Sequence, residues 1–399
     1  MSQRVYLDWN ATSPLRGEAR AAMMCAFDHV GNPSSVHAEG RAARGLVEEA
    51  RRQVAALVAA DPRDVIFTSG GTEANVMALS PALEITGGPK GGAGDCRPYD
   101  RLLLSAVEHP SVRAGGRFPA SAIEEVPVSR DGCIELDALA ARLATLTRSG
   151  ARPLVSIMLA NNETGVIQPI QQAAALVHEA GALLHVDAVQ AAGKIRCDFN
   201  GIGADLMTLS GHKMGAPKGV GALIRRHDRL HLAEPPIKGG GQERSARAGT
   251  ENVPGIVGFG AAAAAAAAAL DQEQARMVTL RGRLEAGLRA ISPEALIFAA
   301  GVDRLPNTTL VALAGIKAET ALIALDLEGI AVSSGSACSS GKVAASHVLA
   351  AMGVGPRLAA GAIRISLGFS TSEEEVDCFL GAWNKLVRAL PKPSHGIAA

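Results

Sequence analysis

Three side chains of this sequence have the chemistry needed to hold an organic cofactor: a lysine, an aspartate and a histidine. Lys213 lies in a turn rich in glycine and serine, and an enclosed lysine amine can form a Schiff base with an aldehyde. Asp187 ends an otherwise apolar run, where a carboxylate needs a cationic partner such as a protonated pyridine nitrogen. His109 could lie flat against an aromatic ring or carry protons. Taken singly, each also fits an ordinary function as a surface charge, a helix N-cap or a structural histidine.

The segment TSGGTE at residues 68–73 adds a candidate phosphate site. A glycine turn that opens a helix presents free backbone N–H groups and the positive end of the helix dipole. The segment matches neither GxxxxGK[ST] nor GxGxxG, so by itself it fits an N-cap turn without a ligand equally well. Together with the aspartate and the lysine, however, the set suits pyridoxal phosphate. The lysine would form the Schiff base, the aspartate would bind the ring nitrogen and the turn would bind the phosphate.

One cysteine lies in a segment that cannot build a core, SSGSACSSG at residues 333–341. A thiol is usually buried as a small hydrophobe, whereas Cys338 is surrounded by serine and glycine. It is either an incidental loop residue or a mobile thiolate nucleophile. The other cysteines show no CxxC spacing, so neither a zinc site nor a disulfide framework is expected, and they should be inert packing residues. They lie at positions 25, 96, 133, 197 and 378.

Short apolar runs alternate with amphipathic segments through the first two thirds of the chain. Strands are expected at 65–67, 101–104, 154–159, 183–186, 205–209 and 220–224, and helices at 39–59, 136–146 and 171–180. This order predicts an α/β fold with a doubly wound, mostly parallel sheet.

Polar groups follow five of these predicted strands. They occupy residues 68–73, 108–110, 161–163, 187–190 and 210–213. In open α/β sheets, ligands bind at the carboxyl ends of the strands. Five endings of this kind predict one shared cofactor site.

The pattern changes near Pro254, where a second, smaller α+β domain is expected. An alanine-rich stretch at about 255–291 predicts one long linking helix. Residues 16–255 would form the large cofactor-binding domain, and residues 1–15 with 256–399 would form the small domain, which carries the cysteine segment 333–341. Residues 87–98 are expected to form a surface loop.

The composition excludes several function classes. Lysine plus arginine and aspartate plus glutamate both number 39, so the net charge is zero, and aromatic residues are 3% of the chain. Neither value favours binding to nucleic acid. The start of the chain shows no signal peptide, and the apolar run 256–270 is shorter than a membrane span. We therefore expect a cytoplasmic protein that binds no membrane.

The chain resembles the cysteine desulfurases of iron–sulfur cluster assembly, within the class V aminotransferase family of fold-type I pyridoxal phosphate enzymes. Matching motifs run in family order along nearly the whole chain. They are YLDWNATSPL (6–15), GNPSSVHAEGRAAR (31–44), FTSGGTEANVMAL (67–79), EHPSV (108–112), NNETGVIQPI (161–170), HVDAVQAAGK (185–194), SGHKMGAPKGVGAL (210–223), GGGQERSARAGTENVPGIVG (239–258), SSGSACSSG (333–341) and IRISLG (363–368).

This resemblance implies a role for each matching residue. Lys213 would hold the cofactor covalently and act as a base, and His109 would stack on the ring. Asp187 would pair with the ring nitrogen and Gln190 with the ring hydroxyl. The phosphate would be bound by Gly71, Thr72, Ser210 and His212. Asn162 would lie near the ring and the substrate carboxylate, which Arg364 would hold. No metal is implied.

The resemblance also implies the reaction and the partners. L-cysteine would be converted to L-alanine, and Cys338 would take the sulfur as a persulfide and pass it to an acceptor such as an iron–sulfur scaffold protein. Thr250 would reach the cofactor phosphate of a second subunit, so a homodimer is expected. Two features depart from the family pattern, Met214-Gly215-Ala216 and the long 87–98 loop. An aminotransferase, a selenocysteine lyase and a non-enzymatic scaffold remain alternatives.

Overall fold

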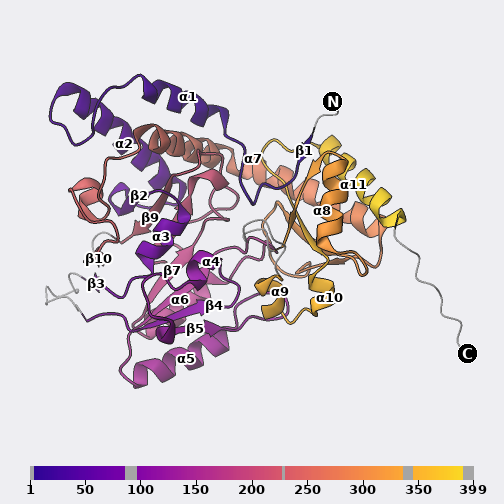
Figure 1. Ribbon diagram of the computed structural model, residues 1–399. Helices are drawn as coiled ribbons and strands as arrows, with labels where there is room; N and C mark the ends of the chain where they lie inside the picture. The colour runs from indigo at the N-terminus through magenta and orange to yellow at the C-terminus, as the bar shows by residue number, and fades with distance from the viewer. Residues whose placement is uncertain (1–3, 86–96, 227–229, 336–344, 390–399) are drawn as a thin grey trace, which may run out of the picture.

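The computed structural model describes residues 4–85, 97–226, 230–335 and 345–389 (Figure 1). Within them, the largest sheet has seven strands in the order β2-β9-β8-β7-β6-β4-β5, and every neighbouring pair is parallel except the two that β9 makes. The strands are β2 (Val65–Thr68), β4 (Arg101–Ser105), β5 (Ile123–Val126), β6 (Pro153–Met158), β7 (Leu183–Asp187), β8 (Leu206–Ser210) and β9 (Gly221–Arg225). The expected α/β class and mostly parallel sheet are confirmed. The edge strand β5, whose sequence IEEV is half polar, was not predicted.

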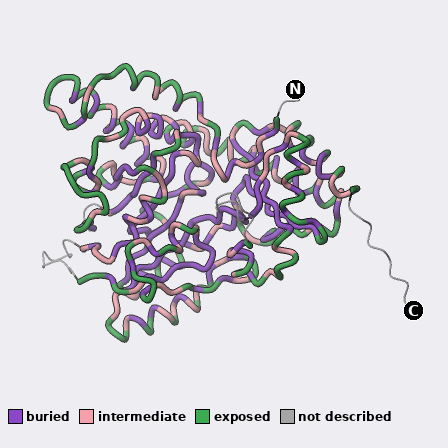
Figure 2. Tube along the Cα trace, viewed as in Figure 1, coloured by how far each residue is buried: buried purple, intermediate pink, exposed green. Residues whose placement is uncertain are grey.

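Helices cover both faces of this sheet, which accounts for strands that are buried along their whole length (Figure 2). One face packs against α2 (Ala38–Leu57), α5 (Leu136–Arg148) and α6 (Ile170–Glu179). The other face packs against α3 (Gly71–Ala78) and α4 (Pro110–Arg113). The doubly wound arrangement predicted from the alternating pattern is therefore present.

A second sheet is built from the C-terminal part of the chain. Its antiparallel order is β11-β12-β15-β14, with β11 (Leu296–Ile297), β12 (Thr308–Ala312), β14 (Ser333–Ser334) and β15 (Ala362–Ser366). A core separate from that of the large sheet lies between this sheet and the helices α8 (Ala318–Leu327) and α11 (Glu373–Arg388). The first strand of the chain, β1 (Val5–Tyr6), pairs with β13 (Ile330–Ala331). Val5 of this strand and Leu7, which follows it, belong to this core. The domain boundaries at 15/16 and 255/256 stay a prediction.

The long helix α7 (Val253–Ile291) contacts both parts of the fold. It packs on α1 (Gly17–Phe27) and α2 near its start and on α11 near its end. A Cβ at Gly258 would lie 2.6 Å from Met23 and one at Gly260 would lie 2.6 Å from the Ala50 backbone. These two glycines therefore permit close helix packing.

By length and composition α7 could cross a membrane, although half of its most apolar window is buried inside the fold. The absence of a membrane-bound form stays a prediction.

The remaining elements are small. Strands β3 (Leu83–Ile85) and β10 (Leu230–Leu232) form an antiparallel pair, and α9 (His347–Ala351) and α10 (Pro356–Ala359) precede β15. Most of the 87–98 loop lies outside the described residues.

Candidate active site

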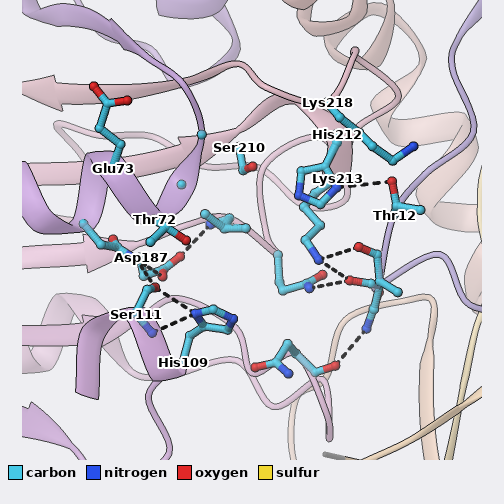
Figure 3. A pocket seen from close by; sticks show the side chains of 18 of the residues that line it. Thr12, Thr72, Glu73, His109, Ser111, Asp187, Ser210, His212, Lys213 and Lys218 are labelled. Atoms are coloured by element: carbon cyan, nitrogen blue, oxygen red, sulfur yellow. Dashed lines mark hydrogen bonds between the residues drawn. The ribbon is translucent and has the colours of Figure 1, made fainter. Parts of the chain in front are cut away.

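A cavity of about 600 Å³ lies at the carboxyl ends of the large-sheet strands (Figure 3). Ten of the predicted site residues line it: Gly71, Thr72, His109, Asn162, Asp187, Gln190, Ser210, His212, Lys213 and Arg364. The first nine end or follow strands of the large sheet, whereas Arg364 lies on β15 of the second sheet. The cavity is therefore formed where the two sheets meet.

Lys213 ends a short 3-10 turn that follows directly on β8. Its Nζ donates to the backbone carbonyls of Asn10, at 2.6 Å, and Ala11, at 2.8 Å. Ser13 in turn donates its hydroxyl to the Lys213 carbonyl at 2.8 Å. The N-terminal segment 10–13 thus fixes the amine that is predicted to hold the cofactor. Sequence reasoning missed this contact, because a backbone carbonyl gives no signal in residue type.

A series of hydrogen bonds between side chains connects Asp187 to His109. The amide of Asn75 donates to Asp187 Oδ2 and to Ser111 Oγ, both at 2.9 Å. The Ser111 hydroxyl lies 2.7 Å from His109 Nδ1, and the Ser111 backbone N–H donates to the same nitrogen at 3.1 Å. Because Nδ1 accepts a backbone N–H, the proton of the neutral imidazole is on Nε2. Neither Asn75 nor Ser111 was predicted, although both lie in motifs that the sequence analysis quoted.

Burial lowers the pKa of His109, and the charge of Lys213 adds to this effect while Asp187 opposes it. The imidazole is therefore neutral near pH 7. His212 behaves in the same way: burial and the nearby lysines, Lys213 and Lys218 among them, lower its pKa to about 4. Its Nδ1 lies 3.2 Å from Thr12 Oγ1.

The start of α3 forms one end of the cavity. A Cβ at Gly71 would lie 3.0 Å from Val189 Cγ2 and 3.3 Å from Ser210 Cβ, so a side chain would have little room there. The first-turn N–H groups of a helix have no partner within the helix. The cationic Lys218 lines the same cavity. This end has the donors and the charge that a phosphate requires.

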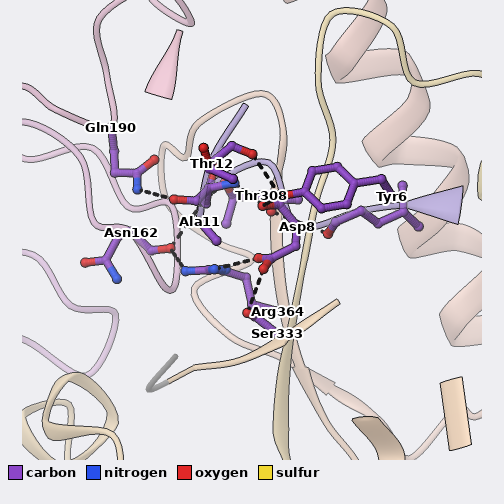
Figure 4. A network of polar contacts seen from close by, with 12 residues as sticks. Tyr6, Asp8, Ala11, Thr12, Asn162, Gln190, Thr308, Ser333 and Arg364 are labelled. Atoms are coloured by element: carbon purple, nitrogen blue, oxygen red, sulfur yellow. Dashed lines mark hydrogen bonds and ion pairs between the residues drawn. The ribbon is translucent and has the colours of Figure 1, made fainter. Parts of the chain in front are cut away.

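Arg364 is 2% exposed and already has two partners (Figure 4). Its Nη1 donates to the Asn162 carbonyl at 2.9 Å, and its Nη2 pairs with Asp8 Oδ1 at 2.8 Å. Its Nε is buried and has no hydrogen-bond partner among the described residues. The other Asp8 oxygen accepts the Ser333 hydroxyl at 3.0 Å. Asp8 was not predicted.

Two of the predicted site residues are not among those that line this cavity. Thr250 is exposed and lines a neighbouring cavity of about 160 Å³, which shares Ser69 with the main one. Cys338 lies outside the described residues. The described start of its segment is β14, in which Ser333 pairs with Arg364 of β15. The described start of the cysteine segment therefore lies beside the arginine.

The expectation of five inert packing cysteines is wrong for two of them. Cys25 and Cys378 are exposed, Cys133 is half-buried and Cys197 is buried, while Cys96 lies outside the described residues. Both exposed cysteines lie on the solvent side of helices, α1 and α11, where small side chains need not pack. Within the described residues no cluster of histidine, cysteine or carboxylate side chains could hold a metal. The expectation of a metal-free site stays a prediction.

The aminotransferase class-V family matches this chain over residues 5–379. A cysteine desulfurase of Gluconacetobacter diazotrophicus is 42% identical over 98% of this chain and 95% of its own length. The chain belongs to the cysteine desulfurases of the class-V aminotransferase family. The cysteine desulfurase IscS of Dictyoglomus turgidum is 39% identical, over 98% of this chain and 96% of its own.

The solved structures agree with this family assignment. The NifS-like protein of Rickettsia africae superimposes with a TM-score of 0.85 at 34% identity, covering 97% of this chain and 100% of that one. The predicted family, fold-type I architecture and enzyme class are confirmed. Cysteine desulfurases are sulfurtransferases, so the chemistry to be placed in the cavity is the removal of sulfur from an amino acid.

Proposed function

We propose that this cysteine desulfurase converts L-cysteine to L-alanine in the cavity at Lys213, with pyridoxal phosphate as cofactor and Cys338 as the first sulfur acceptor. The observation that carries the proposal is the meeting of three groups in one cavity. A lysine amine, a buried carboxylate and a buried arginine, namely Lys213, Asp187 and Arg364, all line it.

The donor set of the cavity fits pyridoxal phosphate. Asp187 is 5% exposed, and its described hydrogen-bond donors, Asn75 and the Val189 backbone N–H, are uncharged. A protonated ring nitrogen would supply the positive charge that a buried carboxylate requires. The α3 terminus at Gly71, with Ser210 and His212, would hold the phosphate at the other end. A cavity of about 600 Å³ lies within the range of small-molecule sites.

When bound, pyridoxal phosphate supplies an electron sink that stabilises negative charge at the substrate α-carbon. Each residue then has a limited task. Lys213 holds the cofactor and moves the α-proton. Arg364 binds the substrate carboxylate, and the Asn162 carbonyl fixes its guanidinium. His109, neutral through burial, would stack on the ring and offer its Nε2–H.

The sulfur transfer balances without an outside oxidant. The Cys338 thiolate attacks the substrate sulfur, an S–S bond forms on the enzyme and the substrate C–S bond breaks. The carbon that loses sulfur gains a proton and becomes the alanine methyl group. The persulfide on Cys338 then passes to an acceptor protein, for which the relatives named IscS and NifS suggest an iron–sulfur scaffold. An acceptor of this kind, and the absence of disulfides among the described cysteines, fit a cytoplasmic enzyme.

The surface near Thr250 supports a homodimer. Large apolar side chains on α1 and the loop after it are exposed by 62–86%: Met24, Phe27, Val30 and Val36. The same loop contacts the segment before Thr250, where Gln242 Nε2 lies 3.4 Å from Ser34 Oγ. Exposed apolar side chains near a residue that should reach a second cofactor are best covered by a second copy of this chain.

Two substitutions test the proposal. Lys213→Ala should abolish the absorbance band of the lysine-bound cofactor. Cys338→Ala should keep that band while sulfur release from L-cysteine falls by at least 100-fold. Unchanged turnover in Cys338→Ala would favour an aminotransferase or a lyase acting on selenocysteine, neither of which needs this thiol. Purified protein that takes up no pyridoxal phosphate would favour a non-enzymatic scaffold.

A further inference from the structure

The proposed mechanism leaves the buried Lys194 without a function. Its side chain lies outside the lining of the active-site cavity, and the residue is 7% exposed. Its Nζ donates to the side-chain oxygen of Gln190 at 2.8 Å and to the Gln190 backbone carbonyl at 3.0 Å. Burial, together with the positive charges of Lys213 and Arg364, places the pKa of Lys194 well below its usual range. A lysine is costly to bury, and both of its described hydrogen bonds go to a single residue of the site.

These contacts determine which way the Gln190 amide faces. A glutamine side chain has one accepting and one donating side, so its orientation follows from its neighbours. Oε1 accepts from Lys194. Nε2 donates to the Asn10 carbonyl at 2.9 Å, the contact drawn from Gln190 in Figure 4. Lys194 and Asn10 thus give the same assignment of the oxygen and the nitrogen of the Gln190 amide. The NH₂ side therefore faces the part of the cavity wall where Asn10 also accepts the Lys213 amine.

We propose that Lys194 is a positioning residue that keeps the NH₂ side of Gln190 directed toward the bound cofactor. The inference rests on the proposed function, together with the hydrogen bond from Gln190 to the ring hydroxyl of pyridoxal phosphate that the family resemblance implies. Without Lys194 only the Asn10 carbonyl fixes the amide, so turning it over costs less, and its oxygen would then oppose the ring oxygen. A flipped amide would lose a hydrogen bond and leave a buried acceptor without a donor.

A purely structural function is the competing explanation. Lys194 also satisfies the Gln190 backbone carbonyl, and it follows a turn in which Gly193 has a φ of +77°. A Cβ at Gly193 would lie 3.1 Å from Met214, so this turn packs directly against the segment after Lys213. Loss of Lys194 could therefore act by loosening the turn. The two explanations differ in one respect: only positioning requires the Gln190 side chain.

A double-mutant cycle separates them. The apo-proteins of the wild type, Lys194→Met, Gln190→Ala and the double variant are titrated with pyridoxal phosphate, and their thermal unfolding is recorded. Lys194→Met should weaken cofactor binding about 5-fold to 10-fold, as expected for one lost hydrogen bond. In the Gln190→Ala background the same change should weaken binding less than 2-fold. The pH midpoint of the bound-cofactor absorbance band should also move in both single variants.

The control is Lys385→Met, which removes an exposed lysine paired with Glu328 at 2.6 Å. It should bind the cofactor as the wild type does. If Lys194→Met does not fold, Gln190→Glu provides the test with Lys194 intact. That variant puts an oxygen where the NH₂ group lies, so it should bind pyridoxal phosphate more weakly than Gln190→Ala.

Three results would overturn this inference and leave the proposed function standing. They are an equal effect of Lys194→Met on cofactor affinity with and without the Gln190 side chain, wild-type affinity in folded Lys194→Met, or tighter cofactor binding by Gln190→Glu than by Gln190→Ala. A wild-type protein that forms no Lys213-dependent band overturns the proposed function as well.

Discussion

Glu163 should make the protein less stable as the pH rises from 4.5 to about 7. The side chain is 3% exposed and accepts the Ser346 hydroxyl at 2.6 Å. Burial raises its pKa from 4.5 to about 7, although the Ser346 hydrogen bond and the charge of Arg364 oppose the rise. The folded state therefore binds this proton more tightly than the unfolded state does. The stabilising effect is complete below pH 4.5 and is lost between pH 4.5 and about 7.

The size of the effect follows from the same values. A rise in pKa from 4.5 to about 7 corresponds to about 3 kcal/mol between the two protonation states. Glu163→Gln has the shape of the protonated side chain at every pH and can still accept from Ser346. The variant should match the wild type at pH 4.5 and be more stable at pH 8 by up to about 3 kcal/mol. For a chain of 399 residues that unfolds as one unit, this is a difference of about 4 °C in Tm.

Thermal unfolding of cofactor-loaded protein at a series of pH values measures this difference. The matched control is Glu179→Gln, an exposed glutamate at the end of α6, which should show no pH-dependent gain. Equal stability of Glu163→Gln and wild type at pH 8, or a gain confined to low pH, would refute the reasoning. Either result would mean that Glu163 is ionised at no cost in the folded protein.

Two further substitutions have expected outcomes. Gly71→Ala should weaken pyridoxal phosphate binding about 10-fold with little change in the unfolding of the apo-protein. The reason is that the new methyl group would press on Val189 and Ser210 at the phosphate end. An unchanged affinity in the cofactor titration would mean that the phosphate binds elsewhere. Arg51→Met should lower the free energy of unfolding by about 3–5 kcal/mol in urea, because it leaves the buried Glu243 carboxylate without the two 2.8 Å bonds of its arginine. Replacing Arg51 and Glu243 together by Met should restore part of that loss, and an equal loss in the single and double variants would contradict the ion-pair argument.

The sequence predicted the large sheet well because its strands are buried on both faces. Runs such as LVSIM in β6 are apolar except for one serine, and a run of this kind between amphipathic helices has few other interpretations. Strand β5 was not predicted, because two of its four residues are glutamates at the sheet edge. The polar residues after the strands were also predictable, since the carboxyl ends of parallel strands share one edge.

The contacts that complete the site were not predictable in this way. Asp8 meets Arg364 across 356 residues, and Lys213 meets Asn10 across 203. Neither pairing leaves a periodic signal, because the segment that contains Asp8 and Asn10 is short and irregular. The contact of Asn75 with Asp187 was not predicted for a different reason. It lies on the helix that follows the phosphate turn, where an asparagine is ordinarily expected to face solvent.

These long-range contacts show why the N-terminal segment belongs to the active site. Asp8 pairs with Arg364 of the second sheet, and the Asn10 amide donates to Thr308 of the same sheet at 2.8 Å. The Asn10 carbonyl accepts from both Lys213 and Gln190 of the large sheet. One short segment therefore fixes the groups predicted to bind the substrate carboxylate and those predicted to bind the cofactor. A change of distance between the two sheets would strain this segment first, so the placement of Lys213 and that of Arg364 should be coupled through it.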